Sequence, residues 1–411
     1  MTTTITNIPR LTAGQRQIIG LGWLTYAAYY LGRVNISTAM PDLQADLGWS
    51  ASQVGLLTSG FFWTYAFGNL INGQLGDRFS VRWFVFTGIV GSVLINLMVG
   101  TLSSLPLIIL LWSINGYFQA TGWAPILRLL ANWLSPEQRN KISGGFGSSF
   151  VAGNALTWLL SGWVVETWGW RAAFWLPALL FMLIGLLWFV SVRDVPGSHE
   201  PSFEPAPARS APALASVFQA MRLNFQRFWP LLMVAAAIGF GFVALLIWIP
   251  TYYVEVGRLE IGRASSIASL LPFVGIGGTL FVGWLVGRYM VGRETTALTL
   301  IISLVLILLV IYPLLPFSLI PSTVLLLLIS GIVYAAASVT LTTMSLVFSN
   351  RENAASLAGT VGFAFNVGGG ISGWAVGSLL DGFGWSAVFW GLAGAMLLGL
   401  VSILLARRFL K

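Results

Sequence analysis

Long apolar segments recur along the whole chain, and short polar loops separate them. The hydrocarbon core of a bilayer is about 30 Å thick, so a helix needs roughly 20 apolar residues to cross it. The sequence therefore predicts an all-α membrane protein with twelve transmembrane helices. The predicted spans cover residues 16–40, 52–75, 82–101, 105–133, 142–165, 171–192, 228–251, 265–288, 295–314, 320–348, 354–378 and 385–406.

The low charge content excludes several classes of protein. Only 8% of the residues are charged and 57% are hydrophobic, whereas a soluble domain carries about 25% charged residues. The net charge of +8 is spread over short loops with no dense basic run, so no nucleic-acid partner is expected. The expected partner of such a surface is the lipid bilayer, and a monomer is expected.

No catalytic, cofactor or metal site is predicted. The chain has no cysteine, and its one histidine, His199, lies in a polar stretch. No Ser/His/Asp set and no carboxylate pair stands out, so an enzyme is not expected.

A polar stretch divides the predicted spans six and six. Arg193–Gln226 contains five prolines among glycine, serine and alanine, a composition typical of a linker. A short helix is expected near Leu214–Phe225. The predicted domains are an N-terminal bundle at 1–192, a cytoplasmic linker at 193–226 and a C-terminal bundle at 227–411.

The basic residues predict the orientation of the chain. With the N-terminus inside, sixteen of the 21 basic residues fall on the cytoplasmic side. Only Arg171, Arg258 and Arg263 fall outside, so both termini are predicted to be cytoplasmic. The expected location is a bacterial inner membrane.

Three short patterns of the first half return in the second half, which indicates a duplicated six-helix unit. Parallel repeats place a substrate cavity between the halves, near the middle of the membrane. The spacings are 210 for Gly73–Arg78 and Gly283–Arg288, 215 for Gly169–Trp175 and Gly384–Trp390, and 209 for Pro41 and Pro250.

The stretch Gly73–Arg82 resembles the loop motif between the second and third helices of the major facilitator superfamily. This resemblance implies a gating role for Asp77, Arg78 and Arg82, whose charge-assisted bonds would hold the two bundles in one state. The alternative is a solvated turn with positive charges on the cytoplasmic side.

Four further stretches resemble the organophosphate:phosphate antiporters, with the anion:cation symporters next in similarity. The resemblance implies a transporter for a phosphorylated or carboxylated metabolite that works by alternating access. The stretches are Tyr29–Pro41, Gln119–Arg128, Ala131–Arg139 and Trp248–Val256.

Arg33 is the principal candidate for binding the anion. An arginine inside a span costs roughly 2.5–3.5 kcal/mol on insertion scales, so it usually faces a cavity and a partner. Tyr26, Tyr29 and Tyr30 lie one to two turns before it and are expected to add hydroxyl groups on the same face. The alternative is that Arg33 snorkels to the outer interface, eight residues before Pro41.

Further candidates line the predicted cavity. Arg128 and Gln119 are polar groups in apolar helices, and each could instead form a structural bond. Phe150, Phe242 and Trp248 are expected to supply apolar surface. The antiporter family has a second arginine at the position of Phe242 and a histidine near Phe150, so a monoanion, or a ligand with one acidic group and an apolar body, fits better than a dianion.

No acidic residue lies deep in a predicted span, which favours exchange or facilitated movement over proton coupling. Glu166 and Asp381 are the fallback candidates for a proton site. The leading hypothesis is a secondary active or facilitative transporter of a small organic anion. A membrane sensor on a transporter fold and a proton-coupled organic acid symporter are the alternatives.

Overall fold

The computed structural model describes residues 11–195, 214–348 and 354–406, and every regular element in these ranges is helical. His199 and the linker prolines lie outside the described residues. The elements of the first half are α1 (Ala13–Ala28), the 3₁₀ turn η1 (Tyr29–Gly32), α2 (Asn35–Leu47), α3 (Ala51–Arg78), α4 (Val81–Val99), α5 (Leu105–Gln119), α6 (Trp123–Trp133), α7 (Pro136–Trp168) and α8 (Ala172–Ser191).

In the second half, α9 and α15 each comprise two helices that meet at a residue with non-helical backbone angles. α9 is kinked at Phe228 and includes the helix expected near residues 214–225, and α15 is kinked at Gly384 (φ 76°). The elements are α9 (Leu214–Glu255), α10 (Ile261–Ala268), α11 (Leu270–Tyr289), α12 (Glu294–Ile311), η2 (Tyr312–Leu314), α13 (Leu319–Ser338), the π turn η3 (Val339–Met344), α14 (Ser345–Val347) and α15 (Ala354–Ala406).

Three long helices of the first half begin with the same local signal. A serine or threonine side chain accepts the backbone N–H three residues on, and the glutamine at that position bonds back to the cap. The pairs are Thr12–Gln15 in α1, Ser50–Gln53 in α3 and Ser135–Gln138 in α7. These caps satisfy donors that the first turn of a helix leaves open.

Four of the predicted spans are not single α-helices. The segment 265–288 divides at Ser269 between α10 and α11, and 320–348 runs from α13 through the π turn η3 into α14; the other two have wider breaks. The segment 16–40 is broken between Ala28 and Asn35, and the segment 105–133 is broken between Gln119 and Trp123. The apolar pattern runs through both breaks and therefore conceals them. Within the described residues, seven helical stretches are long and apolar enough to cross a membrane: Val81–Val99, Ala172–Ser191, Phe218–Glu255, Ile261–Tyr289, Glu294–Leu314, Leu319–Met344 and Ser356–Leu405.

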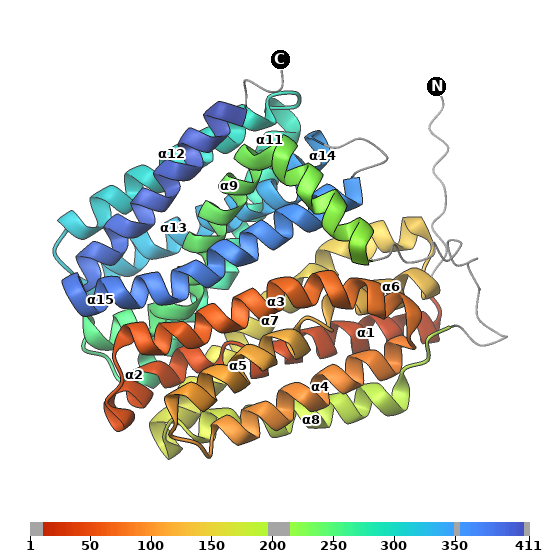
Figure 1. Ribbon diagram of the computed structural model, residues 1–411, viewed down its shortest axis with the longest axis horizontal. Coiled ribbons are helices and arrows are strands. Elements are labelled where there is room, and N and C mark those ends of the chain that lie inside the picture. Colours follow the sequence, from red (N-terminus) through yellow and green to blue (C-terminus); the bar gives the residue numbers. More distant parts are fainter. Residues whose placement is uncertain (1–10, 196–213, 349–353, 407–411) are drawn as a thin grey trace.

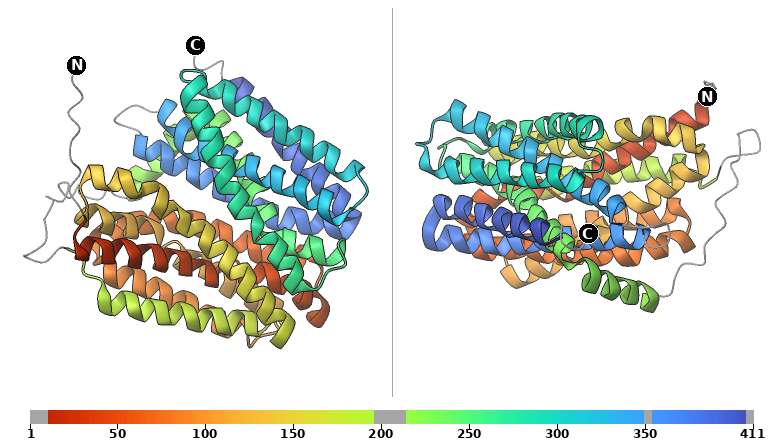
Figure 2. Two further views of the ribbon diagram at one scale, coloured as in Figure 1. Left: turned by 180° about the vertical axis from the view of Figure 1, so that it is seen from behind. Right: turned by 90° about the horizontal axis from the view of Figure 1, so that it is seen from above.

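The helices form two groups. α1–α8 lie together, as do α9–α15, and the axes of the two groups diverge toward the end where the N-terminus emerges (Figures 1 and 2). α3 packs along α15, and α7 packs against α10. These two helix pairs join the groups, which are called the N-terminal group and the C-terminal group below.

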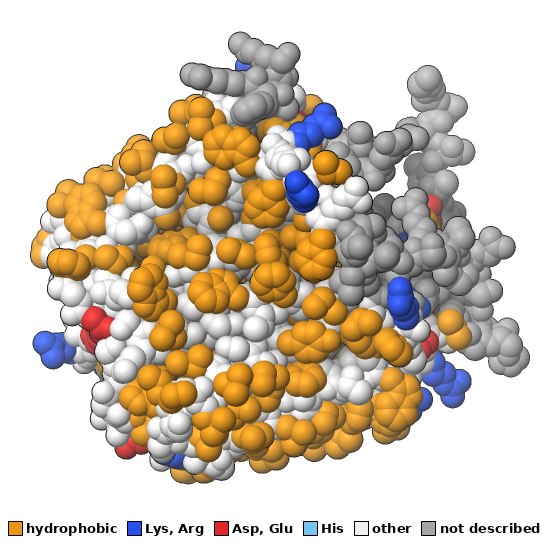
Figure 3. Space-filling view, in the orientation of Figure 1, with side chains coloured by type: hydrophobic (Ala, Val, Ile, Leu, Met, Phe, Trp, Pro, Cys, Tyr) orange, Lys and Arg blue, Asp and Glu red, His pale blue; other side chains and the backbone are white. Residues whose placement is uncertain are grey.

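The surface suits a lipid environment. Large apolar side chains such as Leu183, Val190 and Ile320 are 63%, 76% and 75% exposed. Figure 3 shows hydrophobic side chains over the middle of the molecule, with charged side chains near its edges. Hydrocarbon solvates such side chains without cost.

Candidate functional site

The first predicted span breaks where Arg33 lies. α1 ends at Ala28, η1 forms one tight turn and α2 starts at Asn35. Arg33 itself has φ −120° and ψ −52°, outside the helical region. Membrane proteins tolerate such irregular backbone where it is buried in protein or lines a cavity. The break therefore marks a place to look for a binding site.

Polar side chains of the neighbouring helices α4 and α5 donate hydrogen bonds to a backbone carbonyl at this break between helices. Asn115 and Asn96 donate to the carbonyl oxygen of Gly32 at 2.8 and 3.4 Å. The Ser92 hydroxyl donates to Asn115 at 2.6 Å, and the Gln119 amide donates to Ser92 at 2.8 Å. This buried network fixes Gln119 beside Arg33.

Arg33 lies inside the protein, 6% exposed, so it does not snorkel to the outer interface. Its Nε donates to Gln119 Oε1 at 3.2 Å, and one terminal nitrogen donates to the Tyr30 hydroxyl at 3.4 Å. The guanidinium carbon lies 4.7 Å from the Tyr30 ring centre and 4.6 Å from that of Tyr65. These contacts are polar and aromatic, and none is an ion pair.

Arg33 is the only charged side chain that is buried within the described part of the chain. The one ion pair found there joins Arg171 to Asp46 elsewhere, so no described carboxylate neutralises Arg33. A buried charge without a partner is costly, and an anionic ligand would supply the missing countercharge.

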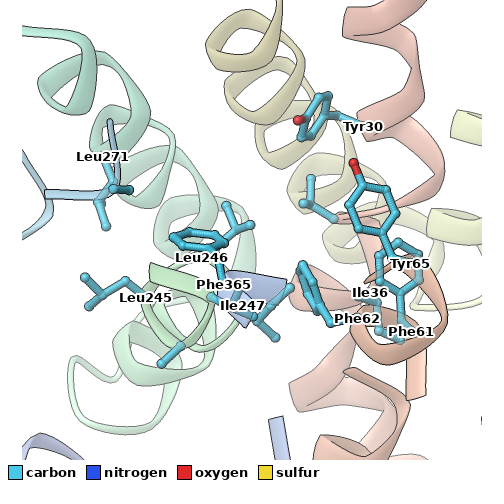
Figure 4. Close-up of a cluster of buried hydrophobic side chains, with 14 of the residues drawn as sticks. Tyr30, Ile36, Phe61, Phe62, Tyr65, Leu245, Leu246, Ile247, Leu271 and Phe365 are labelled. Carbon is cyan, nitrogen blue, oxygen red and sulfur yellow. The ribbon is translucent and has the colours of Figure 1, made fainter. Parts of the chain in front are cut away.

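Two tyrosines direct their hydroxyl groups toward this region. Figure 4 shows Tyr30 and Tyr65 on the N-terminal group, with Leu246 and Phe365 of the C-terminal group across from them. Tyr65 was not predicted as a site residue. It lies 32 positions after Arg33 in the sequence, and only the packing of α3 brings it near.

The three predicted tyrosines do not share one face. Tyr30 contacts Arg33, and the Tyr26 ring lies 5.9 Å from the Tyr30 ring. Tyr29 points the other way, because its hydroxyl contacts Val85 O at 3.3 Å and Thr121 Oγ1 at 3.0 Å. The prediction for Tyr29 is corrected: the 3₁₀ turn rotates it away from Arg33, toward α4 and the break between α5 and α6.

Arg128 is also remote from Arg33. Its guanidinium donates to the carbonyl oxygens of Gly76 and Phe79, the latter at 3.2 Å. These carbonyls lie at the C-terminal end of α3, where a helix has unpaired acceptors and favours a cation. Arg128 therefore forms the structural bond that was the alternative to substrate contact.

The predicted apolar residues meet between the two groups. Phe150 of α7 lies 5.3 Å from Tyr30 and 6.2 Å from Phe242 of α9, measured between ring centres. Phe242 also contacts Tyr334 at 4.6 Å and Phe365 at 5.5 Å. Rings from both groups therefore extend from Arg33 across the interface.

Trp248 lies six residues further along α9, about 9 Å by helical rise. It is 2% exposed, and its indole N–H has no hydrogen-bond partner within the described residues. It is not among the rings that contact Phe242.

The predicted gating residues lie at the opposite end of α3 from Ser50. The side chain of Asp77 lies outside the described residues, and Arg78 is exposed. Arg82 stacks on Phe189 at 4.3 Å, and its backbone N–H donates to Asp194 at 2.8 Å. In this state its described contacts stay within the N-terminal group.

A tight contact joins α3 to α15 near the start of α3. The Asp381 carboxylate accepts the backbone N–H groups of Ala51 and Ser52 at 2.8 and 2.9 Å, which caps α3 from the other group. A β-carbon on Gly373 would lie 2.6 Å from the carbonyl oxygen of Gly55. Only glycine therefore permits the two backbones to approach this closely.

A similar contact joins α7 to α10. The Glu166 carboxylate lies against Gly262, at the first turn of α10, and would collide with a β-carbon there. Glu166 and Asp381 are 215 positions apart, the spacing of the repeated Gly-Trp pattern. Glu166 lies two residues before the end of α7, and Asp381 lies three residues before the break in α15 at Gly384.

Gly32→Ala is expected to destabilise the protein at the site, although this residue is not expected to contact a ligand. A β-carbon there would lie 3.0 Å from Ser92 Oγ and 3.1 Å from the amide nitrogens of Asn96 and Gln119. Because all three atoms belong to the buried network, we expect a loss of about 1–2 kcal/mol of stability. Thermal unfolding of the purified protein measures it. Gly20→Ala is the control, since a β-carbon there meets nothing within 4 Å. Equal unfolding temperatures for the two variants would contradict the expectation.

Comparison of the sequence with known proteins identifies a family and several relatives of this chain. The family model described as Major Facilitator Superfamily matches residues 22–373. The glycerol-3-phosphate transporter of Bacillus subtilis is 27% identical over 402 residues, which cover 93% of this chain and 90% of that protein. A probable hexose phosphate transport protein of Chlamydia muridarum is 29% identical over 281 residues, 63% of this chain. That alignment spans only 61% of the chlamydial protein's length.

Structure comparison agrees on the fold. A bacterial homologue of the human lysosomal transporter Spinster, in an inward-facing and unoccupied conformation, superposes with a TM-score of 0.76. The superposition covers 97% of each chain at 16% identity, so the likeness concerns the fold alone.

Proposed function

Because the chain belongs to the Major Facilitator Superfamily, we propose that it is a secondary transporter that carries a small organic anion across the membrane. The protein is an integral membrane protein of this family, and the two relatives described above are transporters rather than enzymes. The proposed substrate is a phosphorylated or carboxylated metabolite. Facilitated movement and exchange both fit the proposal.

One observation carries the proposal. Arg33 is buried at a helix break near the interface of the two groups, and it has no carboxylate partner within the described residues. A fixed guanidinium with tyrosine hydroxyl and amide groups beside it can bind a carboxylate or phosphate through directed hydrogen bonds. Arg128, in contrast, donates to the backbone carbonyls at the end of α3. Arg33 donates to one backbone carbonyl, Gln119 O at 3.5 Å, and to the side chains of Gln119 and Tyr30.

The proposed architecture has twelve spans in two bundles, residues 1–192 and 227–411, joined by the linker 193–226. The repeated spacings and the paired contacts of Asp381 with α3 and Glu166 with α10 support the duplication. We place the starts of α3 and α10 on the outer side. Alternating access then requires these two contacts to separate while the opposite ends of the bundles approach.

Reporter fusions test the proposed orientation. Fusions after Asp194 and at Lys411 are expected to read as cytoplasmic, because sixteen basic residues sort to that side. A fusion within the loop near Arg258 should read as external and serves as the control. External signals from the first two fusions would contradict the orientation.

Flux in proteoliposomes tests the function. Purified protein should mediate saturable exchange of labelled organic anions, and the anions should leave chemically unchanged. Ligand binding without flux would favour a sensor on the same fold. Chemical conversion of the ligand would indicate an enzyme.

A further inference from the structure

We propose that the anion bound at Arg33 carries a single negative charge and a flat apolar body, such as an aromatic monocarboxylate. This inference rests on the proposed function and names the substrate class of that site. Two observations carry it: the charge asymmetry between the two halves, and the aromatic rings that extend from Arg33.

The two halves place different residues at equivalent positions. Pro41 and Pro250 are 209 positions apart, and the same spacing leads from Arg33 to Phe242. A phenyl ring therefore occupies the place where a symmetric site would hold a second guanidinium. Since no other charged side chain is buried in the described ranges, the site supplies one positive charge.

One buried positive charge matches one negative charge. A dianion would leave a net charge of −1 in a region of low dielectric constant, where an uncompensated charge is costly. The fork of Arg33, with the Tyr30 hydroxyl beside it, offers donors to the two oxygens of a carboxylate.

The path from Arg33 into the interface is aromatic. The Tyr30 ring lies 4.7 Å from the guanidinium carbon, Phe150 lies 5.3 Å from Tyr30, and Phe242 lies 6.2 Å from Phe150. Phe150 and Phe242 are only partly buried, so their rings are not closed off by protein. An anion held by Arg33 would therefore place its body against these two rings.

The facing wall gives a polyhydroxylated body few hydrogen bonds. Leu246 and Phe365 of the C-terminal group lie across from Tyr30 and Tyr65 (Figure 4), and the Tyr334 ring beside Phe242 adds one hydroxyl group. A sugar has more hydroxyl groups than these few partners can satisfy, and each hydroxyl left without a partner costs about 1–3 kcal/mol. A flat apolar body loses nothing and gains ring contacts.

A panel of five compounds tests the class on the purified full chain. Benzoate has one charge and a ring; acetate keeps the charge, glucuronate replaces the ring by a polyol, phenyl phosphate doubles the charge, and glycerol 3-phosphate lacks the ring and is divalent. Thermal stabilisation as a function of concentration gives each affinity. We expect benzoate to bind at least about tenfold more tightly than the other four.

The outcomes separate this inference from the proposed function. If glycerol 3-phosphate or glucuronate binds most tightly and Arg33→Gln abolishes that binding, the substrate class is wrong while the anion site stands. If none of the five compounds stabilises the protein or exchanges across proteoliposomes, both proposals fail.

Phe242→Arg provides the second test, with Phe242→Leu as the matched control. The arginine is expected to shift the affinity ratio of phenyl phosphate to benzoate at least about tenfold toward the phosphate, whereas the leucine should leave it near the wild-type value. An unchanged ratio in a folded Phe242→Arg variant would contradict the inference. If that variant does not fold, Phe150→Asn should lower benzoate affinity toward that of acetate, and unchanged benzoate affinity would contradict the inference equally.

Discussion

Arg33→Ala is expected to weaken ligand binding strongly while the protein remains folded. The substitution removes the only buried cation in the described part of the chain, so the anion would lose its charge partner. Loss of a desolvated charge partner costs a few kcal/mol, and 1.4 kcal/mol is a factor of ten. The expected loss of affinity is therefore on the order of tenfold to a thousandfold, measured by thermal stabilisation or calorimetry.

Arg33→Lys is expected to restore binding only in part. Lysine keeps the charge, but it lacks the planar fork that reaches both Gln119 and the Tyr30 hydroxyl. Arg171→Ala is the control, because Arg171 pairs with Asp46 at the surface. A folded Arg33→Ala variant with normal affinity would show that Arg33 has a structural role and that the site is wrong.

Gly373→Leu is expected to impair transport because the larger side chain prevents α3 and α15 from coming into contact. The added β-carbon would lie 2.6 Å from Gly55 O and 2.8 Å from Ser59 N, and backbone atoms cannot move aside as a side chain can. The two bundles would then stay separated at the end of the molecule where α3 begins. Exchange should fall at least about tenfold, a shift in the conformational equilibrium of about 1.4 kcal/mol or more.

Cysteine labelling measures this opening directly. The natural chain contains no cysteine, so a single Phe62→Cys substitution reports access to the interface just beyond Ser59. Labelling by an impermeant reagent from the outside should rise in Gly373→Leu. It should not rise in Gly394→Leu, where a β-carbon meets nothing within 4 Å.

Asp381→Asn is expected to give a smaller shift in the same direction. It retains one acceptor for Ala51 and Ser52 but removes the charge. Labelling equal to wild type in both Gly373→Leu and Asp381→Asn would mean that this contact does not gate the protein.

The sequence predicted the helical class because apolar length is a property of each segment by itself. It did not reveal the break at Tyr29–Gly32, since that break is stabilised by Ser92, Asn96 and Asn115 from other helices. An apolar pattern cannot show that a neighbouring helix will satisfy an open carbonyl. The break at Gly384, in contrast, falls between the predicted spans 354–378 and 385–406.

The sequence predicted those residues of the candidate site that are set apart by their charge or by their spacing along one helix. A lone arginine in an apolar segment is costly, which singled out Arg33, and its neighbour Tyr30 followed from helical spacing. Tyr29 was misplaced because a 3₁₀ turn changes the rotation per residue. Tyr65 was missed because its contact with Arg33 depends on how α3 packs.

Uptake of a labelled organic monoanion into proteoliposomes, compared between wild type and Arg33→Gln, tests the transport function and its site most directly. Glutamine keeps hydrogen-bonding capacity while removing the charge, so folding is checked in parallel by unfolding temperature. We expect saturable exchange by the wild type and none above empty liposomes by the folded variant. Equal exchange by both proteins, or no exchange of any organic anion by the wild type, would contradict transport at Arg33.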